Sequence, residues 1–171
     1  MFYYCFLWRK LLLTENIFGM ITSEKGIALI KSFEGLRLRA YKDPGSKNGL
    51  PITIGWGSTM YTDGRKIKLG DIITKEQAEE MLRWEVKNKS AVLRGLQLPF
   101  NQNQFDALTS FIFNIGVGNF LSSTLLKRIK INVNDPDIKN QFSRWIYNDG
   151  KVLDTLVKRR KKESDLYFKT S

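Results

Sequence analysis

The sequence predicts an α+β fold, with short antiparallel strands confined to its first half and helices in the remainder. Two strand-like segments, 38–42 and 50–54, flank a glycine-containing turn. From Thr74 onward, apolar residues recur with the spacing of amphipathic helices. The 171 residues, 42% hydrophobic and 12% aromatic, fit one compact unit or two small lobes that share a helix.

The first expected helix begins after Met20, where Thr22 or Ser23 can cap it, and leads to Glu34. Ile27 and Ile30 precede Glu34 by seven and four positions, so the three side chains share one helical face. Because this face is apolar, Glu34 is directed at the body of the protein. Apolar surroundings disfavour the ionised form of a carboxyl group, as a general acid working near neutral pH requires.

The rest of the first half predicts a small sheet. A third strand is expected around Met60 and Tyr61, ahead of the turn signal Asp63-Gly64. Because so small a sheet buries little surface, it must pack against a helix.

The second half predicts helices. Thr74 and Gln77 form a capping box that begins the longest one, to about Asn88. Asn101 and Gln104 form a variant of this box, ahead of a stretch that is apolar nearly all round and predicts a buried central helix. The other expected helices run from Ser122 or Ser123 to about Lys130, from Pro136 to Asn148, and from about Asp154 to Phe168.

Composition limits the chemistry. The 28 Lys and Arg against 17 Asp and Glu give a net charge of +11, which favours a polyanionic partner such as nucleic acid, anionic lipid or an acidic cell wall. The chain has no histidine, and its single cysteine is Cys5, so His-based triads, zinc-type clusters and internal disulfides are excluded. Any catalysis must use carboxylates, hydroxyls, amides or basic groups, and no metal or organic cofactor is expected.

Two acids in contrasting surroundings are the candidate catalytic pair. Glu34 is expected on an apolar face, whereas Asp43 lies beside Lys42 and Pro44 in a polar turn, where a carboxylate stays ionised. Glycoside hydrolysis uses such a pair. The plainer interpretation is that both are ordinary surface residues, at a helix end and in a turn.

The stretch from Glu34 to Asp43, EGLRLRAYKD, followed by TIGWG from Thr53 to Gly57, resembles the catalytic segment of the phage-type lysozymes, or endolysins. That glycoside hydrolase family places a Glu, eight residues and an Asp or Cys ahead of a Thr-x-Gly-x-Gly strand. The first spacing matches, whereas the gap before Thr53 is a few residues longer than in the shortest members. The segments 101–108, 113–116 and 156–163 also resemble the family, so the likeness spans about residues 22–168.

The resemblance implies a lysozyme-like fold. A small mixed lobe (20–73) and a larger all-helical lobe (92–171) are joined by a long helix (74–91), with the substrate cleft between the lobes. Residues 1–19 form a hydrophobic and basic extension outside the likeness. This extension is either an over-long gene prediction or weakly ordered tail, or it is a membrane anchor. Arg9 and Lys10, in the middle of the segment, argue against the anchor.

The resemblance also implies hydrolysis of the β-1,4 bond between N-acetylmuramic acid and N-acetylglucosamine in bacterial peptidoglycan. Glu34 would donate a proton to the glycosidic oxygen. Asp43 would stabilise the oxocarbenium charge and position or deprotonate the attacking water, and Thr53 would orient that water. The separation of the carboxyl groups decides between an inverting and a retaining course. A monomer made in the host cytoplasm that acts on the wall after release is expected. The alternative, a non-catalytic wall-binding protein on the same fold, is disfavoured because both acids are present.

Five further residues are candidate substrate contacts, and all but Thr59 have a structural alternative. They are Trp56, Thr59, Phe113, Asn114 and Ser123. Trp56, between two glycines, could face a sugar ring or fill the core. Phe113 and Asn114 could simply end the buried helix, and Ser123 could be a plain N-cap.

Two other features bear on partners and stability. Ser58 stands where many relatives carry a histidine that helps to hold the small lobe to the large one. The run from Lys158 to Lys162 is interpreted as a solvated helix face. From Ser123 onward, 12 basic and 6 acidic residues leave a surplus of six, which favours weak attraction to the anionic wall over nucleic-acid binding.

Overall fold

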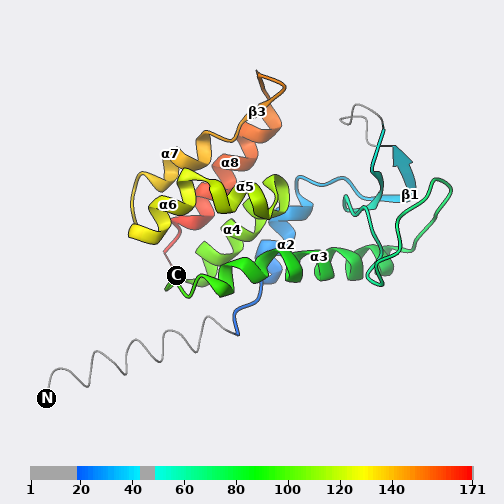
Figure 1. The fold of residues 1–171 in the computed structure, drawn as a ribbon, viewed down its shortest axis with the longest axis horizontal. Helices are drawn as coiled ribbons and strands as arrows, with labels where there is room; N and C mark the ends of the chain where they lie inside the picture. Colours follow the sequence, from blue (N-terminus) through cyan, green and yellow to red (C-terminus); the bar gives the residue numbers. More distant parts are fainter. Residues whose placement is uncertain (1–18, 43–48, 171) are drawn as a thin grey trace, which may run out of the picture. The chain divides into compact units, whose positions relative to one another are not determined.

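The computed structural model describes residues 19–42 and 49–170, and it confirms the α+β class (Figure 1). The elements, in chain order, are α2 (Glu24–Lys31), β1 (Arg37–Lys42), β2 (Ile52–Gly55), α3 (Lys75–Gly95), α4 (Gln102–Ile115), α5 (Val117–Ser122), α6 (Thr124–Ile131), α7 (Ile138–Ser143), β3 (Tyr147–Asn148), β4 (Lys151–Val152) and α8 (Asp154–Tyr167). None of the helices in these described ranges is both long and apolar enough to cross a membrane.

The described residues separate into two compact units. Residues 30–88, here called the sheet unit, are continuous in sequence. Residues 19–29 and 89–170, here called the helical unit, come from both sides of it. Helix α3 contributes residues to both units.

The sheet unit is built on one antiparallel pair. Strand β1 pairs with β2, with Tyr41 opposite Thr53, and the register shifts between Arg37 and Tyr41. The sheet packs on the first turns of α3, and the buried core residues are Ala40, Ile54, Ile67, Ile73, Ala78 and Met81. The expected third strand is wrong, because Met60 forms only an isolated bridge to Lys66 across a tight turn.

The helical unit is organised around α4, which packs along α8 (Figure 1). Every residue from Asn103 to Phe113 is buried, which confirms the predicted central helix. The remaining core side chains come mainly from α5 to α8 and include Phe120, Leu125, Leu126, Ile129, Ile138, Phe142 and Tyr167. Short α5 was not predicted, and it follows directly on the positive φ of Gly116.

Both predicted capping boxes are present. At the start of α3, Gln77 N–H donates to Thr74 Oγ1 at 3.2 Å, and Thr74 N–H donates to Gln77 Oε1 at 2.8 Å. At the start of α4, Asn101 and Gln104 exchange the same two bonds. These reciprocal bonds satisfy backbone N–H groups at the start of each helix, which have no hydrogen-bond partner within the helix itself.

The expected helix from Pro136 to Asn148 is wrong in its second half. Helix α7 ends at Ser143, and a hairpin of β3 and β4 follows, so this part of the chain is not all helical. Asp149 and Gly150, with φ of 47° and 74°, form the turn between the strands. Two successive positive φ angles match the right-handed twist of a two-residue hairpin, which is why Asp-Gly favours such turns. The helix expected up to Asn148 would end immediately before this pair.

Candidate active site

Glu34 lies in the turn that follows α2, rather than on the helix itself. The helix ends at Lys31, and the backbone N–H of Glu34 still donates to Ile30 O at 3.2 Å. Ile27 and Ile30 are buried, as predicted for the face that leads to Glu34. The Glu34 side chain is half-buried.

Thr53 is held in β2, at the beginning of the segment that resembles the family strand. Its side chain is buried, and its hydroxyl donates to Pro51 O at 3.3 Å. After β2 the chain turns sharply, because Ile54 and Ser58 exchange two backbone hydrogen bonds of 2.9 Å. Gly55 and Gly57 have φ of 66° and 96°, values that side-chain-bearing residues rarely adopt, so glycine suits both positions of this turn.

The turn after β2 brings the backbone to the carboxyl group of Glu34. A Cβ atom added at Gly57 would lie 3.8 Å from Glu34 Oε2. The structure therefore places Glu34 beside the Thr53–Gly57 segment, although 19 positions separate Glu34 from Thr53 in the sequence. Asp43 and the turn that follows it lie outside the described residues.

Trp56 packs on the core of the sheet unit, in agreement with its structural interpretation. The ammonium group of Lys31 lies 5.5 Å from the centre of its ring, and Lys31 also pairs with Glu79. The indole N–H is buried, and no hydrogen-bond partner for it is found among the described residues. Thr59 is exposed, just beyond the turn.

Ser58 joins the same turn to helix α3. Its side chain is buried, and its hydroxyl donates to Glu85 Oε2 at 3.3 Å. Both residues belong to the sheet unit. A neutral hydroxyl group therefore makes this link between the turn and α3.

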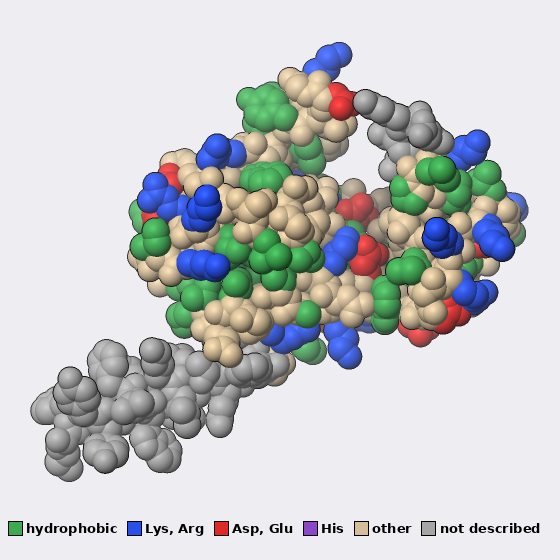
Figure 2. All heavy atoms as spheres, in the orientation of Figure 1, with side chains coloured by type: hydrophobic (Ala, Val, Ile, Leu, Met, Phe, Trp, Pro, Cys, Tyr) green, Lys and Arg blue, Asp and Glu red, His purple; other side chains and the backbone are tan. Residues whose placement is uncertain are grey.

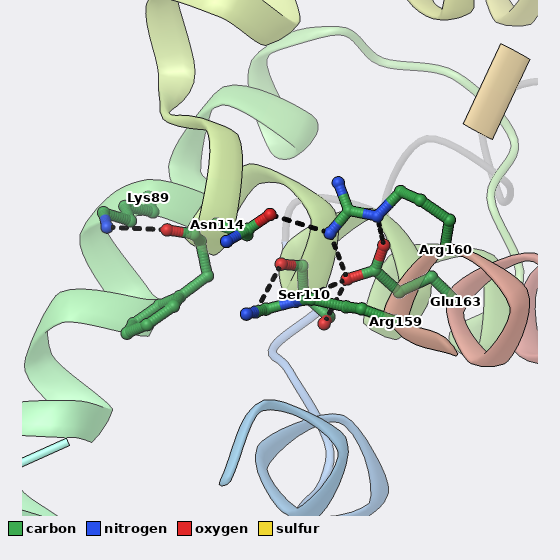
Figure 3. A network of polar contacts seen from close by, with 7 residues as sticks. Lys89, Ser110, Asn114, Arg159, Arg160 and Glu163 are labelled. Carbon is green, nitrogen blue, oxygen red and sulfur yellow. Dashed lines mark hydrogen bonds and ion pairs between the residues drawn. The ribbon is translucent and has the colours of Figure 1, made fainter. Parts of the chain in front are cut away.

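The three remaining predicted residues lie in the helical unit. Phe113 is buried, with Lys89 Nζ 4.3 Å from its ring centre and donating to its carbonyl oxygen at 3.1 Å (Figure 3). Asn114 is exposed at the end of α4, and its Oδ1 accepts a hydrogen bond from Arg160 Nη2 at 2.9 Å. Ser123 is the N-cap of α6, since its hydroxyl oxygen accepts from Leu126 N–H at 3.0 Å.

The interpretation of residues 158–162 as a solvated helix face is wrong at two positions. Arg159 and Arg160 are buried, and both form ion pairs with the fully buried Glu163 (Figure 3). The spacing carried a signal for this cluster, because Glu163 follows the two arginines by four and three positions and so shares their helical face. Burial raises the pKa of Glu163, an effect that the two guanidinium groups oppose.

Figure 2 shows Lys and Arg side chains at several separate places on the visible face.

Comparison with known proteins places these motifs in a family. The family model described as phage lysozyme matches residues 31–163. An endolysin of Acyrthosiphon pisum secondary endosymbiont phage 1 is 40% identical over 154 residues, covering 86% of this chain and 98% of that protein. The endolysin of Bacillus phage PZA is 42% identical over 86% of this chain, which spans only 55% of that longer protein.

A solved structure shares the fold. The endolysin from Escherichia coli O157:H7 phage FAHEc1 superposes with a TM-score of 0.77 at 37% identity, over 88% of this chain and 94% of that one. The sequence match covers the Glu34 turn, the Thr53 strand and the central helices together. The chain belongs to the phage lysozyme family, whose members degrade peptidoglycan.

Proposed function

We propose that this chain is an endolysin with N-acetylmuramidase activity, which hydrolyses the β-1,4 bond between N-acetylmuramic acid and N-acetylglucosamine. The enzyme is made in the cytoplasm of a bacterial host, reaches the wall after release and acts as a monomer. Membership of the phage lysozyme family supports this proposal, as does the presence of Glu34 and Asp43 at the family spacing and of Thr53 at the start of a Thr-x-Gly-x-Gly segment.

The observation that carries the proposal is the proximity of Glu34 to Gly57. A side chain at position 57 would stand in van der Waals contact with Glu34 Oε2. A catalytic acid must come within hydrogen-bond distance of the glycosidic oxygen of a bound sugar. The glycine leaves space next to the carboxyl group for such an approach.

In the proposed reaction, the Glu34 carboxyl group donates its proton to the glycosidic oxygen as the bond from that oxygen to the anomeric carbon breaks. The leaving sugar departs as an alcohol, and positive charge develops on the remaining sugar ring. Asp43 stabilises this charge. In an inverting course Asp43 removes a proton from the attacking water, which Thr53 orients. In a retaining course the Asp43 carboxylate attacks the anomeric carbon itself, and water then hydrolyses the ester.

The test is hydrolysis of purified peptidoglycan, with new reducing ends identified as muramic acid or glucosamine. We expect muramic acid ends from the wild type and at least a ~100-fold lower rate from Glu34→Gln, since general acid catalysis contributes ~10²–10⁴-fold. Glu80→Gln is the matched control, because Glu80 is exposed on α3 in the same unit. A folded wild type that binds walls but releases no reducing ends would instead support the non-catalytic alternative.

The stereochemical course has its own readout. NMR spectra recorded within the first minutes of hydrolysis give the anomeric form of the new reducing end. The α-anomer indicates that Asp43 acts through water, and the β-anomer indicates direct attack. Asp43→Asn should abolish turnover in either course.

A further inference from the structure

Three side chains from three segments of the sheet unit meet where α2 ends. Lys31 is the last residue of α2, Trp56 lies in the turn after β2, and Glu79 lies in α3. The ammonium group of Lys31 pairs with Glu79 and lies 5.5 Å from the centre of the Trp56 ring. These three residues are called here the lysine cluster.

The lysine cluster is largely withdrawn from water. The side chains of Lys31 and Glu79 are 24% and 26% exposed, so salt screens their attraction less than that of a fully exposed pair. Trp56 packs on the core of the sheet unit, and its buried indole N–H has no hydrogen-bond partner among the described residues. Packing and the nearby ammonium group, rather than a hydrogen bond of the indole, therefore hold this ring in place.

The cluster connects the two segments that meet at the candidate site. Lys31 precedes Glu34 by three positions, and the hydrogen bond from Glu34 N–H to Ile30 O keeps the chain between them in a tight turn. Trp56 is followed directly by Gly57, where an added Cβ atom would lie 3.8 Å from Glu34 Oε2. The contact of Lys31 with Trp56 therefore runs parallel to the approach of Glu34 to Gly57.

The turn that carries Trp56 needs such a side-chain contact. Gly55 and Gly57 flank the ring-bearing residue, and glycine has more conformational freedom to lose on folding than any other residue. The backbone bonds between Ile54 and Ser58 close the base of the turn. A contact that fixes the side chain of Trp56 at the tip also limits where Gly57 can lie.

The position of a catalytic acid matters steeply, because a displacement of about 1 Å can cost about 10²-fold in rate. We propose that Lys31 is a positioning residue for Glu34. By holding Trp56 and Glu79, its ammonium group fixes the separation between the Glu34 carboxyl group and Gly57. The glycosidic oxygen is protonated in the space that this separation sets. The inference rests on the proposed function and adds to it a residue that acts only through Glu34.

Lys31→Met isolates the role of the charge, because methionine keeps an unbranched apolar stem over the ring. On solubilised peptidoglycan we expect kcat to fall about tenfold and KM to change by less than about twofold, since the acid moves while the substrate contacts remain. Lys31→Arg retains the cation and should keep kcat within about threefold of the wild-type value. An unchanged kcat in Lys31→Met, or a loss confined to KM, would overturn the inference.

Lys25→Met is the matched control. Lys25 also lies in α2, but it donates to Asn103 Oδ1 at 3.1 Å, and both residues belong to the helical unit. This variant should keep the wild-type kcat, and its thermal unfolding should resemble that of Lys31→Met. Equal losses of kcat in the two variants would trace the effect to general destabilisation and contradict a positioning role.

Glu79 tests whether Lys31 acts through the cluster. Glu79→Gln removes the charge of the partner and keeps a hydrogen-bond acceptor, so it should lower kcat by a smaller factor than Lys31→Met. The double variant should lose no more than Lys31→Met alone, because both changes disrupt one contact. Multiplied losses would show that the two residues act separately. If Lys31→Met fails to fold, Glu79→Gln still decides by whether kcat falls at constant KM.

A measurement without turnover follows the geometry itself. In ¹⁵N-labelled full-length protein, the backbone amide signal of Gly57 should shift as the Glu34 carboxyl group titrates, because the two groups lie close together. Glu34→Gln should remove this response, and Lys31→Met should weaken it. An undiminished response in Lys31→Met would overturn the inference. Since no hydrolysis is needed, a failure of the inference and a failure of the proposed function are observed separately.

Discussion

Asp106 accepts hydrogen bonds from both the backbone N–H and the hydroxyl group of Ser23. The backbone bond is 2.9 Å long, and Gln102 Nε2 donates to the same carboxylate at 2.8 Å. Asp106 is fully buried in α4, whereas Ser23 immediately precedes α2. The start of α2 is thereby fixed to the central helix of the helical unit. Gly26 allows this approach, because a Cβ atom there would lie 2.9 Å from Asp106 Cγ.

Asp106→Ala should lower the free energy of unfolding by about 2–3 kcal/mol, since it leaves buried donors without an acceptor. Asp165→Ala is the control. Asp165 pairs with Lys161 at 2.6 Å, but both side chains are exposed, so its loss should cost less than about 1 kcal/mol. Urea unfolding of the two variants checks the difference, and equal losses would contradict the importance of burial.

The hairpin turn should be sensitive to side-chain identity at Gly150. Its φ of 74° is unfavourable for alanine, so Gly150→Ala should destabilise the protein by about 1 kcal/mol. Gly118→Ala is the control, because Gly118 lies in α5 with open space around it. That change should be neutral or stabilising by up to about 1 kcal/mol. Thermal unfolding gives both values.

Ser58→His should make stability depend on pH near neutrality. A histidine beside Glu85 has its folded-state pKa raised above its unfolded value of about 6.5. Its stabilising contribution is therefore complete below about pH 6.5 and is lost as pH rises through the folded pKa. The larger ring costs about 1–3 kcal/mol at this buried site at any pH, so the pH dependence is the quantity to measure. In a Glu85→Gln background this dependence should vanish, and its persistence would contradict the pairing.

The ionised carboxylate of Asp71 should contribute to the stability of the fold at pH values above its ordinary pKa. The Lys68 backbone N–H, at 2.9 Å, and the Tyr61 hydroxyl, at 3.0 Å, donate to its carboxylate. These bonds lower the pKa of Asp71 below its ordinary value of 3.8. Its contribution is present above about pH 4 and is lost as pH falls through the lowered pKa.

Asp71→Asn should accordingly be less stable than the wild type at pH 6, and the two should converge toward pH 2.5. Tyr61→Phe removes one of the donors and should reduce the difference. Urea unfolding across this pH range tests the prediction. A constant difference between wild type and Asp71→Asn at every pH would contradict it.

Local signals predicted much of this fold. The capping boxes at Thr74 and Asn101 depend on residues three positions apart, and both helices begin where those boxes lie. Strand β1 and helix α8 also begin within one residue of the predicted positions. Each of these features is decided by neighbours along the chain, which the sequence displays directly.

Features decided by distant partners were missed. Arg159 and Arg160 belong to a basic run, and only the carboxylate of Glu163 and the approach of α4 explain their burial. Asp149-Gly150 is compatible with a helix end as well as with a hairpin turn. The pairing of Tyr147 with Val152 makes it a hairpin turn. For the candidate site, the family resemblance predicts Glu34 and Thr53, whereas the proximity of Glu34 to Gly57 required the folded chain.

The interrupted sequence of the helical unit bears on how the protein folds. The Ser23–Asp106 bond closes a span of 83 positions, and the whole sheet unit lies within that span. During synthesis, the sheet unit is finished before any of α4 has been made, so α2 must wait for its partner. Closing so long a loop costs entropy and slows folding more than local helix formation does. A circular permutant that begins at residue 30 and carries residues 19–29 after residue 170 would make the helical unit contiguous, and its refolding should be faster.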